Sequence, residues 1–152
     1  MTPYFDEDGI VIYHGDCREV DAWLKADVLV TDPPYGTDGG NGYGRRQNHD
    51  PAGKVGQQIA NDLDTTTRDA ALALWGDRAA AVFASPRLPE PPGAWNDRLV
   101  WDKKRPGMNG GPWRYRHELI FVRGEWSRVS DRSVSVIEAF PTPCDHPHAK
   151  PL

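Results

Sequence analysis

Residues 28–36 limit the folding of this chain most strongly, because the apolar run Val-Leu-Val leads there directly into Thr-Asp-Pro-Pro-Tyr-Gly. A short continuous apolar run predicts a strand that is buried on both faces of a sheet. In open α/β sheets ligands bind beyond the carboxyl ends of such strands, so we expect Asp32 at a ligand site. Pro33 and Pro34 each hold φ at about −65° and lack an N–H group. They predict a stiff turn whose carbonyl groups can accept hydrogen bonds.

The turn carries groups that suit the exocyclic amino group of a nucleobase. Asp32 and the carbonyl of Pro33 can each accept one N–H of such an amine, which aims the nitrogen lone pair at an incoming methyl group. Positive charge that develops on the nitrogen meets acceptors already in place. Tyr35 can stack on a base that has been flipped out of the duplex. The alternative is a rigid strand-to-loop turn in which Asp32 is only a cap.

Two segments resemble motifs of the amino-methylating DNA methyltransferases, which make N6-methyladenine or N4-methylcytosine. Asp-Pro-Pro-Tyr at 32–35 resembles their catalytic motif. His-Pro-His-Ala-Lys-Pro-Leu at 146–152 is similar to the His-Pro-x-x-Lys-Pro-Leu segment of members whose catalytic motif precedes the cofactor motif, although Thr-Gln is commoner at the variable positions. The resemblance implies catalysis by Asp32, Pro33, Pro34 and Tyr35 and S-adenosylmethionine as cofactor, with Asp32, His146 and Lys150 on the cofactor side. Asp rather than Ser at the start of the motif favours adenine over cytosine.

The resemblance also implies that the cofactor half is missing. Family members continue after His-Pro-x-x-Lys-Pro-Leu with a Phe-x-Gly-x-Gly-like turn that holds S-adenosylmethionine. Asp16 follows an expected strand over 9–14 and resembles a residue that reaches the adenine end of the cofactor, or it caps the next helix. We therefore expect an α/β chain with an incomplete Rossmann-like methyltransferase fold, a mixed sheet lacking its first two strands. A second chain could supply the glycine-rich motif, residues 10–14 could pair directly with residues 28–31, or the chain could be a truncated relic.

The remaining elements follow from periodicity and from Gly and Pro. Apolar residues at 20, 23 and 24 predict a short helix over 18–25 that completes a β-α-β unit. Ala70, Ala71, Leu74 and Trp75 predict the apolar face of a second helix over 66–77. Strands are expected over 79–84, 99–101 and 117–122, and four prolines predict an irregular connection over 85–97.

Length indicates one domain over residues 1–152, and the resemblance implies that it is a partial methyltransferase catalytic domain. No apolar run approaches the roughly 20 residues that span a bilayer, so we expect no membrane partner. The chain has no basic segment followed by an apolar core at its start, and its two cysteines, Cys17 and Cys144, are far apart. These features predict a cytoplasmic protein. Cys144, His146 and His148 alternate on a proline-broken segment and make no tetrahedral metal set.

The net charge of −4 is unevenly distributed. Residues 98–128 hold eight basic and three acidic residues, a balance of +5, and include a basic loop over 102–116. Such a face can hold the phosphates of double-stranded DNA, although a solvated surface without a partner is the alternative. A glycine-rich loop over 36–56 lacks a phosphate-binding spacing and is interpreted as a flexible lid or as disorder. The expected DNA contacts are Arg45, Arg46, Lys103, Lys104, Arg105, Arg114 and Arg116.

Three functional hypotheses follow. The first is a site-specific DNA methyltransferase of the restriction-modification type, acting on adenine and needing a second polypeptide. The second is a catalytically inactive DNA-binding remnant of such an enzyme. The third is methylation of RNA or of a protein glutamine, because related sites use Asn-Pro-Pro-Tyr or similar turns on those substrates. Asp32 and the closing His-Pro segment argue against the third hypothesis.

Overall fold

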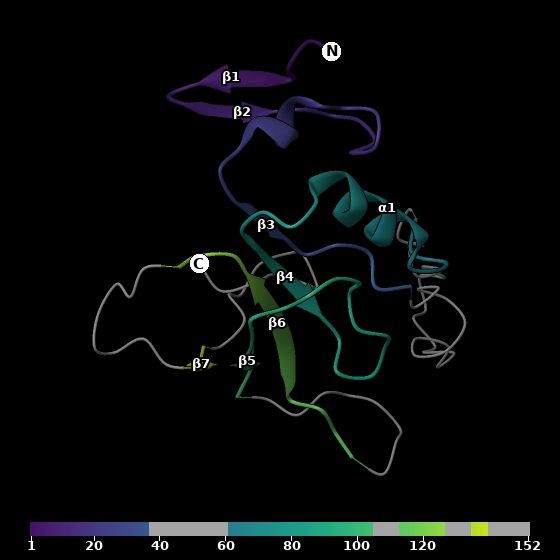
Figure 1. Ribbon diagram of the computed structural model, residues 1–152, viewed down its shortest axis with the longest axis vertical. Helices are drawn as coiled ribbons and strands as arrows, with labels where there is room; N and C mark the ends of the chain where they lie inside the picture. The colour runs from purple at the N-terminus through teal and green to yellow at the C-terminus, as the bar shows by residue number, and fades with distance from the viewer. Residues whose placement is uncertain (37–60, 105–112, 127–134, 140–152) are drawn as a thin grey trace, which may run out of the picture.

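The computed structural model describes residues 1–36, 61–104, 113–126 and 135–139, which form a mixed α/β structure with few helices (Figure 1). The strands are β1 (Phe5–Glu7), β2 (Ile10–Ile12), β3 (Leu29–Thr31), β4 (Ala80–Ala84), β5 (Asp97–Asp102), β6 (His117–Arg123) and β7 (Val136–Glu138), and the helices are the 3-10 helix η1 (Ala22–Lys25) and α1 (Thr66–Trp75). The predicted features that lie outside the described residues are most of the loop 36–56 with Arg45 and Arg46, then Arg105, Cys144 and the segment 146–152 with His146 and Lys150.

Five strands form one mixed sheet in the order β3-β4-β6-β5-β7. β4 is parallel to β3, β6 is antiparallel to both β4 and β5, and β7 is parallel to β5. The strands predicted over 79–84, 99–101 and 117–122 are confirmed as β4, β5 and β6. Residues 85–96 contain no helix or strand, which confirms the irregular connection. β1 and β7 were not predicted.

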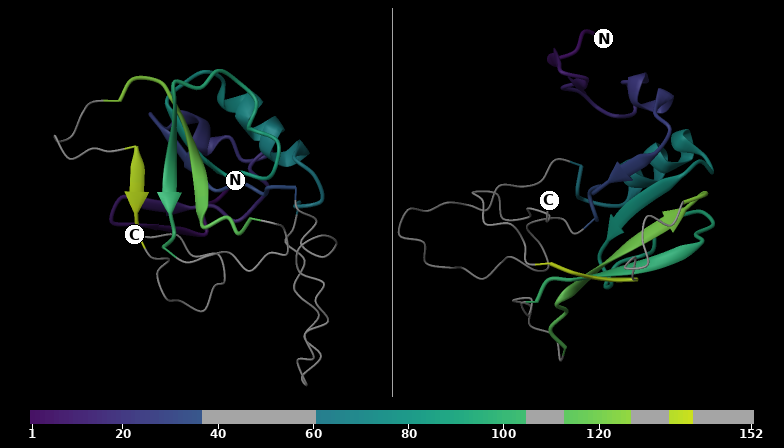
Figure 2. Two further views of the ribbon diagram at one scale, coloured as in Figure 1. Left: turned by 90° about the horizontal axis from the view of Figure 1, so that it is seen from below. Right: turned by 90° about the vertical axis from the view of Figure 1, so that its left-hand side faces the viewer.

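The helix predicted over 66–77 is confirmed as α1, but its buried face differs from the predicted one. α1 buries Arg68, Leu72 and Trp75, whereas Leu74 is 51% exposed. The spacings of four and three residues place the buried side chains on one stripe of the helix. That stripe faces the sheet, where Leu72 and Trp75 join Ala80 and Val82 in the core cluster (Figure 2).

The β-α-β unit predicted for the first 31 residues is wrong. β2 pairs with β1 in a separate hairpin and makes no part of the five-stranded sheet, so it does not pair with β3 either. Asp8 and Gly9 both have positive φ, at 53° and 78°, which is the geometry of a two-residue hairpin turn. Asp-Gly beside an apolar run favours that local pairing. The helix predicted over 18–25 is reduced to η1, and the Trp23 indole donates to the Cys17 carbonyl at 2.8 Å across the turn before it.

β3 is an edge strand among the described residues, and the prediction that it is buried on both faces is wrong. Val28 is 40% and Val30 64% exposed, while Leu29 packs against the core cluster. Within the described part of the chain β3 has one neighbour, β4, and no helix covers the face that carries Val30. The apolar run therefore has one partly buried side chain, Leu29, and two exposed ones.

The core holds β3 in place through tryptophan and arginine side chains. Trp23 of η1 stacks on Trp75 of α1 with ring centroids 5.7 Å apart. The Arg78 guanidinium lies 3.5 Å from the centroid of the Trp75 ring and donates to the carbonyls of Leu24 and Ala26. These contacts join η1 to the end of α1. They place the chain so that it enters β3 alongside β4.

Candidate functional site at the carboxyl end of β3

The ends of several strands meet at one edge of the sheet. β3, β4 and β5 run in one direction and β6 runs in the opposite direction. In the register Leu119 pairs with Ala84, the last residue of β4, and His117 pairs with Asp102, the last residue of β5. The turn after β3, the residue after β5 and the start of β6 therefore lie at the same edge. This is the edge at which open α/β sheets bind ligands.

At this edge the Tyr35 hydroxyl lies between two carboxylates. It donates a hydrogen bond to Oδ1 of Asp32 at 2.6 Å, and Oε2 of Glu118 lies 3.5 Å from it. The Lys103 ammonium forms a hydrogen bond and an ion pair with Oε1, the other carboxylate oxygen of Glu118. Asp32 is exposed, whereas Tyr35, Glu118 and Lys103 are half-buried. The result is a continuous polar row from the strand-end turn to the far side of β6.

Burial raises the pKa of Tyr35 above its ordinary value of 10, and the negative charge of Glu118 and the hydrogen bond to Asp32 raise it further. The hydroxyl therefore stays protonated at neutral pH. It donates a hydrogen bond to Asp32, and Glu118 is the second carboxylate within reach.

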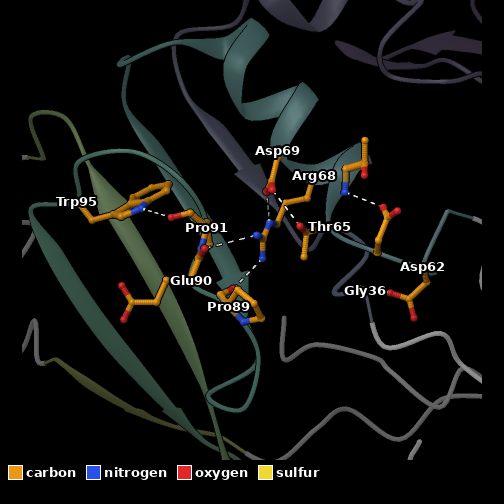
Figure 3. A network of polar contacts seen from close by, with 11 residues as sticks. Gly36, Asp62, Thr65, Arg68, Asp69, Pro89, Glu90, Pro91 and Trp95 are labelled. Carbon is orange, nitrogen blue, oxygen red and sulfur yellow. Dashed lines mark hydrogen bonds and ion pairs between the residues drawn. The ribbon is translucent and has the colours of Figure 1, made fainter. Parts of the chain in front are cut away.

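Gly36 joins the Asp32–Tyr35 turn to the segment before α1 through a hydrogen bond. Figure 3 shows Gly36 beside Asp62. The Gly36 N–H donates to Oδ1 of Asp62 at 2.8 Å, and Asp62 is only 2% exposed. Gly36 has a φ of 77°, and a Cβ there would lie 2.8 Å from the backbone carbonyl carbon of Asp64. Only glycine suits both the left-handed backbone and this close approach.

Asp16, the residue expected at the cofactor, holds the turn that follows β2. Its carboxylate accepts the backbone N–H of Arg18 at 2.9 Å and bonds the guanidinium of the same residue. These bonds to Arg18 lower the pKa of Asp16 from an ordinary 3.8 to about 2. The turn follows the β1–β2 hairpin, outside the five-stranded sheet. The contact of Asp16 with S-adenosylmethionine that the resemblance implies stays a prediction.

The described basic residues that we expect to contact DNA are mostly paired within the protein. Lys103 bonds Glu118, Lys104 bonds Glu138, and Arg116 bonds Asp102 at 2.6 Å. The N–H of Lys104 and the guanidinium of Arg116 lower the pKa of Asp102. DNA phosphates would therefore compete with carboxylates for these three cations. Arg114 lies in the exposed segment that precedes β6.

Sequence reasoning missed Glu118 and the part played by Lys103. Glu118 is predicted as a strand residue, and Lys103 as a phosphate contact in the basic loop. The available signal was the pair His117-Glu118 at the start of an otherwise apolar strand. Which strand end Glu118 reaches depends on the antiparallel placement of β6 between β4 and β5.

Comparison with protein-family models finds no family that matches this chain. Comparison with curated proteins finds no match either. Within the described ranges no group of three or more His, Cys, Asp or Glu side chains could hold a metal ion. In the same residues no helix is both long and apolar enough to cross a membrane.

Proposed function

We propose that this chain holds the target base of an amino-group DNA methyltransferase, with adenine as the target. The observation that carries the proposal is the exposed Asp32 carboxylate, joined to Tyr35 on a proline-stiffened turn at the carboxyl end of β3. The mixed sheet is compatible with the partial Rossmann-like fold expected for such an enzyme. The resemblance of 32–35 to the family's catalytic motif supports the assignment.

In this proposal the turn binds and orients the base. Asp32 and the carbonyl of Pro33 each accept one N–H of the exocyclic amine, and the Tyr35 ring stacks on the flipped base. The Tyr35 hydroxyl already donates to Asp32, so the amine binds in competition with it. Glu118 receives that hydroxyl when it turns away, since its Oε2 is 3.5 Å from the hydroxyl oxygen. Tyr35 thus exchanges one carboxylate for the other as the base enters.

S-adenosylmethionine supplies the methyl group when it is bound, and we propose that a second polypeptide carries most of its site. Asp16 is engaged by Arg18, so it offers no support for a cofactor pocket in the described residues. The partners proposed for the chain are therefore double-stranded DNA and a chain with a glycine-rich cofactor motif.

The test replaces the native copy of the gene by one that encodes Asp32→Ala and maps methylated bases in the DNA of those cells. The proposal expects N6-methyladenine to be lost from one set of sites, because the amine loses its acceptor. Asp97→Ala is the matched control, since Asp97 is an exposed carboxylate at the opposite end of β5. Unchanged methylation in Asp32→Ala, with the protein present at normal level, would refute the proposal.

A catalytically inactive DNA-binding remnant is the second candidate, favoured by the engagement of Asp16 with Arg18. Isothermal titration of the full chain with S-adenosylmethionine distinguishes it from a split enzyme when repeated with a second chain that bears the glycine-rich motif. Heat that appears only with the second chain supports the enzyme. No heat in either mixture supports the remnant.

A further inference from the structure

An unusual run of side chains leads into β6 and includes its first residue. Residues 113–117 alternate aromatic and basic side chains, Trp-Arg-Tyr-Arg-His, and we call them the aromatic–arginine strip. Trp113 is 75% exposed and Tyr115 40% exposed. Large exposed aromatic side chains beside cations are typical of surfaces that bind nucleic acid through base stacking and phosphate contacts.

Tyr115 is held in a defined orientation although it is exposed. The His117 ring meets it edge-on with centroids 5.8 Å apart, and the Arg87 guanidinium lies 5.5 Å from its centroid. Arg87 comes from the connection after β4, so two separate parts of the chain support this ring. A preoriented aromatic ring loses little conformational entropy when a base stacks on it.

The strip leads along the chain toward the candidate site. The Lys103 N–H donates to the Arg116 carbonyl at 2.9 Å, which extends the β5–β6 pairing by one residue into the strip. Glu118, the next residue after the strip, lies 3.5 Å from the Tyr35 hydroxyl. Because successive side chains of a strand point to opposite faces, Tyr115 and His117 lie on the other face of the sheet from Glu118, so the strip and the Asp32 turn are separate surfaces at one end of the sheet.

The charges of this edge favour stacking over phosphate binding. Lys103, Lys104 and Arg116 each pair with a carboxylate, and the whole chain carries a net charge of −4. Such a surface has a small electrostatic attraction for the dense charge of a duplex. Stacking on Trp113 and Tyr115 needs base faces that are exposed, which duplex DNA does not offer.

We propose that the aromatic–arginine strip binds single-stranded DNA and that this strip prefers unpaired strands to duplex. The inference goes beyond the proposed function and does not rest on it, because the strip binds through side chains other than Asp32 and Tyr35. Trp113 and Tyr115 stack on bases. Arg114 contacts the backbone phosphates.

The test measures binding of the full chain to a fluorescent single-stranded oligonucleotide of mixed sequence and to its duplex by anisotropy. Trp113→Ala and Tyr115→Ala are each expected to weaken single-strand binding by about tenfold, which is typical of a lost stacking contact. Trp113→Phe is expected to retain binding within about twofold, because it keeps an aromatic face. Arg114→Ala is expected to reduce the slope of log affinity against log salt by about 0.7.

Tyr4→Ala and Arg98→Ala are matched controls. Tyr4 is 80% exposed before β1, and Arg98 is half exposed at the opposite end of β5 from the strip. Circular dichroism checks that each variant is folded. Duplex binding as tight as single-strand binding, or alanine variants that bind like the wild type, would overturn the inference.

The outcomes also separate the two proposals. Binding needs no methyl donor, so strip-dependent binding together with unchanged DNA methylation in Asp32→Ala cells leaves the strip assigned and refutes the methyltransferase. Loss of methylation in Asp32→Ala cells together with normal binding by the strip variants refutes only the strip.

Discussion

Tyr35 holds its hydroxyl between carboxylates that come from two distant parts of the chain. Asp32 lies on the same turn, while Glu118 arrives on β6, 83 residues away in sequence. The ammonium of Lys103 compensates Glu118 from the opposite side. Whether the Tyr35 hydroxyl donates to Asp32 or to Glu118 decides whether Oδ1 of Asp32 can accept a hydrogen bond from a base without competition from Tyr35.

Glu118→Gln is expected to lower the pKa of Tyr35, because it removes the negative charge that raises this pKa most strongly after burial. NMR titration of ring-labelled tyrosine measures the change, with Tyr35→Phe to assign the signal. Folding raises the pKa of Tyr35, so the unfolded chain ionises first. The free energy of unfolding of the wild type should therefore fall as the pH rises above about 10. The control is Glu125→Gln, on the exposed turn after β6; an equal shift in both variants would contradict a direct interaction with Glu118.

At the scale of elements, polar contacts fasten segments that have no regular structure. Arg68 of α1 is 4% exposed, and its guanidinium donates to the carbonyls of Pro89 at 3.0 Å and Glu90 at 3.4 Å (Figure 3). It also bonds Asp69 at 2.7 Å. The Trp95 indole bonds the Pro91 carbonyl at 2.9 Å within the same connection. Because prolines prevent a crossover helix here, these bonds take the place of helical hydrogen bonds.

Arg68→Met is expected to lower the free energy of unfolding by about 1–3 kcal/mol, because two carbonyl groups lose their buried donor. Urea denaturation followed by circular dichroism measures the loss. Arg98→Met is the control, since the Arg98–Glu90 pair is half exposed and should contribute less than the buried Arg68. Equal midpoints for the two variants would show that Arg68 does not hold the connection.

For the molecule as a whole, one face of the sheet is covered and the other is open in the described residues. α1 and η1 pack on the first face, whereas the second contains a hollow of about 500 Å³. Val30, Phe83, Leu99 and Ile137 contribute to its lining. The exposed β3 edge borders this hollow, and an exposed apolar edge strand promotes association between chains.

Val30→Lys is expected to reduce self-association, because it places a charge on both the strand edge and the apolar face. Sedimentation velocity over a range of concentrations measures the mean mass of the wild type and the variant. Leu74→Lys, at a 51% exposed position on α1, is the control. A wild type that stays monomeric at all concentrations would contradict the expectation.

Sequence reasoning predicted the candidate site only where neighbouring residues define it. Asp32 and Tyr35 were predicted together because two prolines stiffen the turn between them. Glu118 and Lys103 were not predicted as a pair beside Tyr35, because no local pattern indicates which strand ends share an edge. β2 was misplaced for a similar reason, since its apolar residues fit a sheet or a hairpin equally well until the Asp-Gly turn is considered.

Local patterns were sufficient to determine the proline turn after β3, the helix α1 and the strands β4, β5 and β6. These features depend on backbone restrictions and on side-chain spacing within a few residues. Only the tertiary structure decided that β3 is an edge strand and that Glu118 lies beside the Tyr35 hydroxyl. The burial of β3 and the Tyr35–Glu118 approach depend on strand order and register, which arise from contacts between residues far apart in the chain.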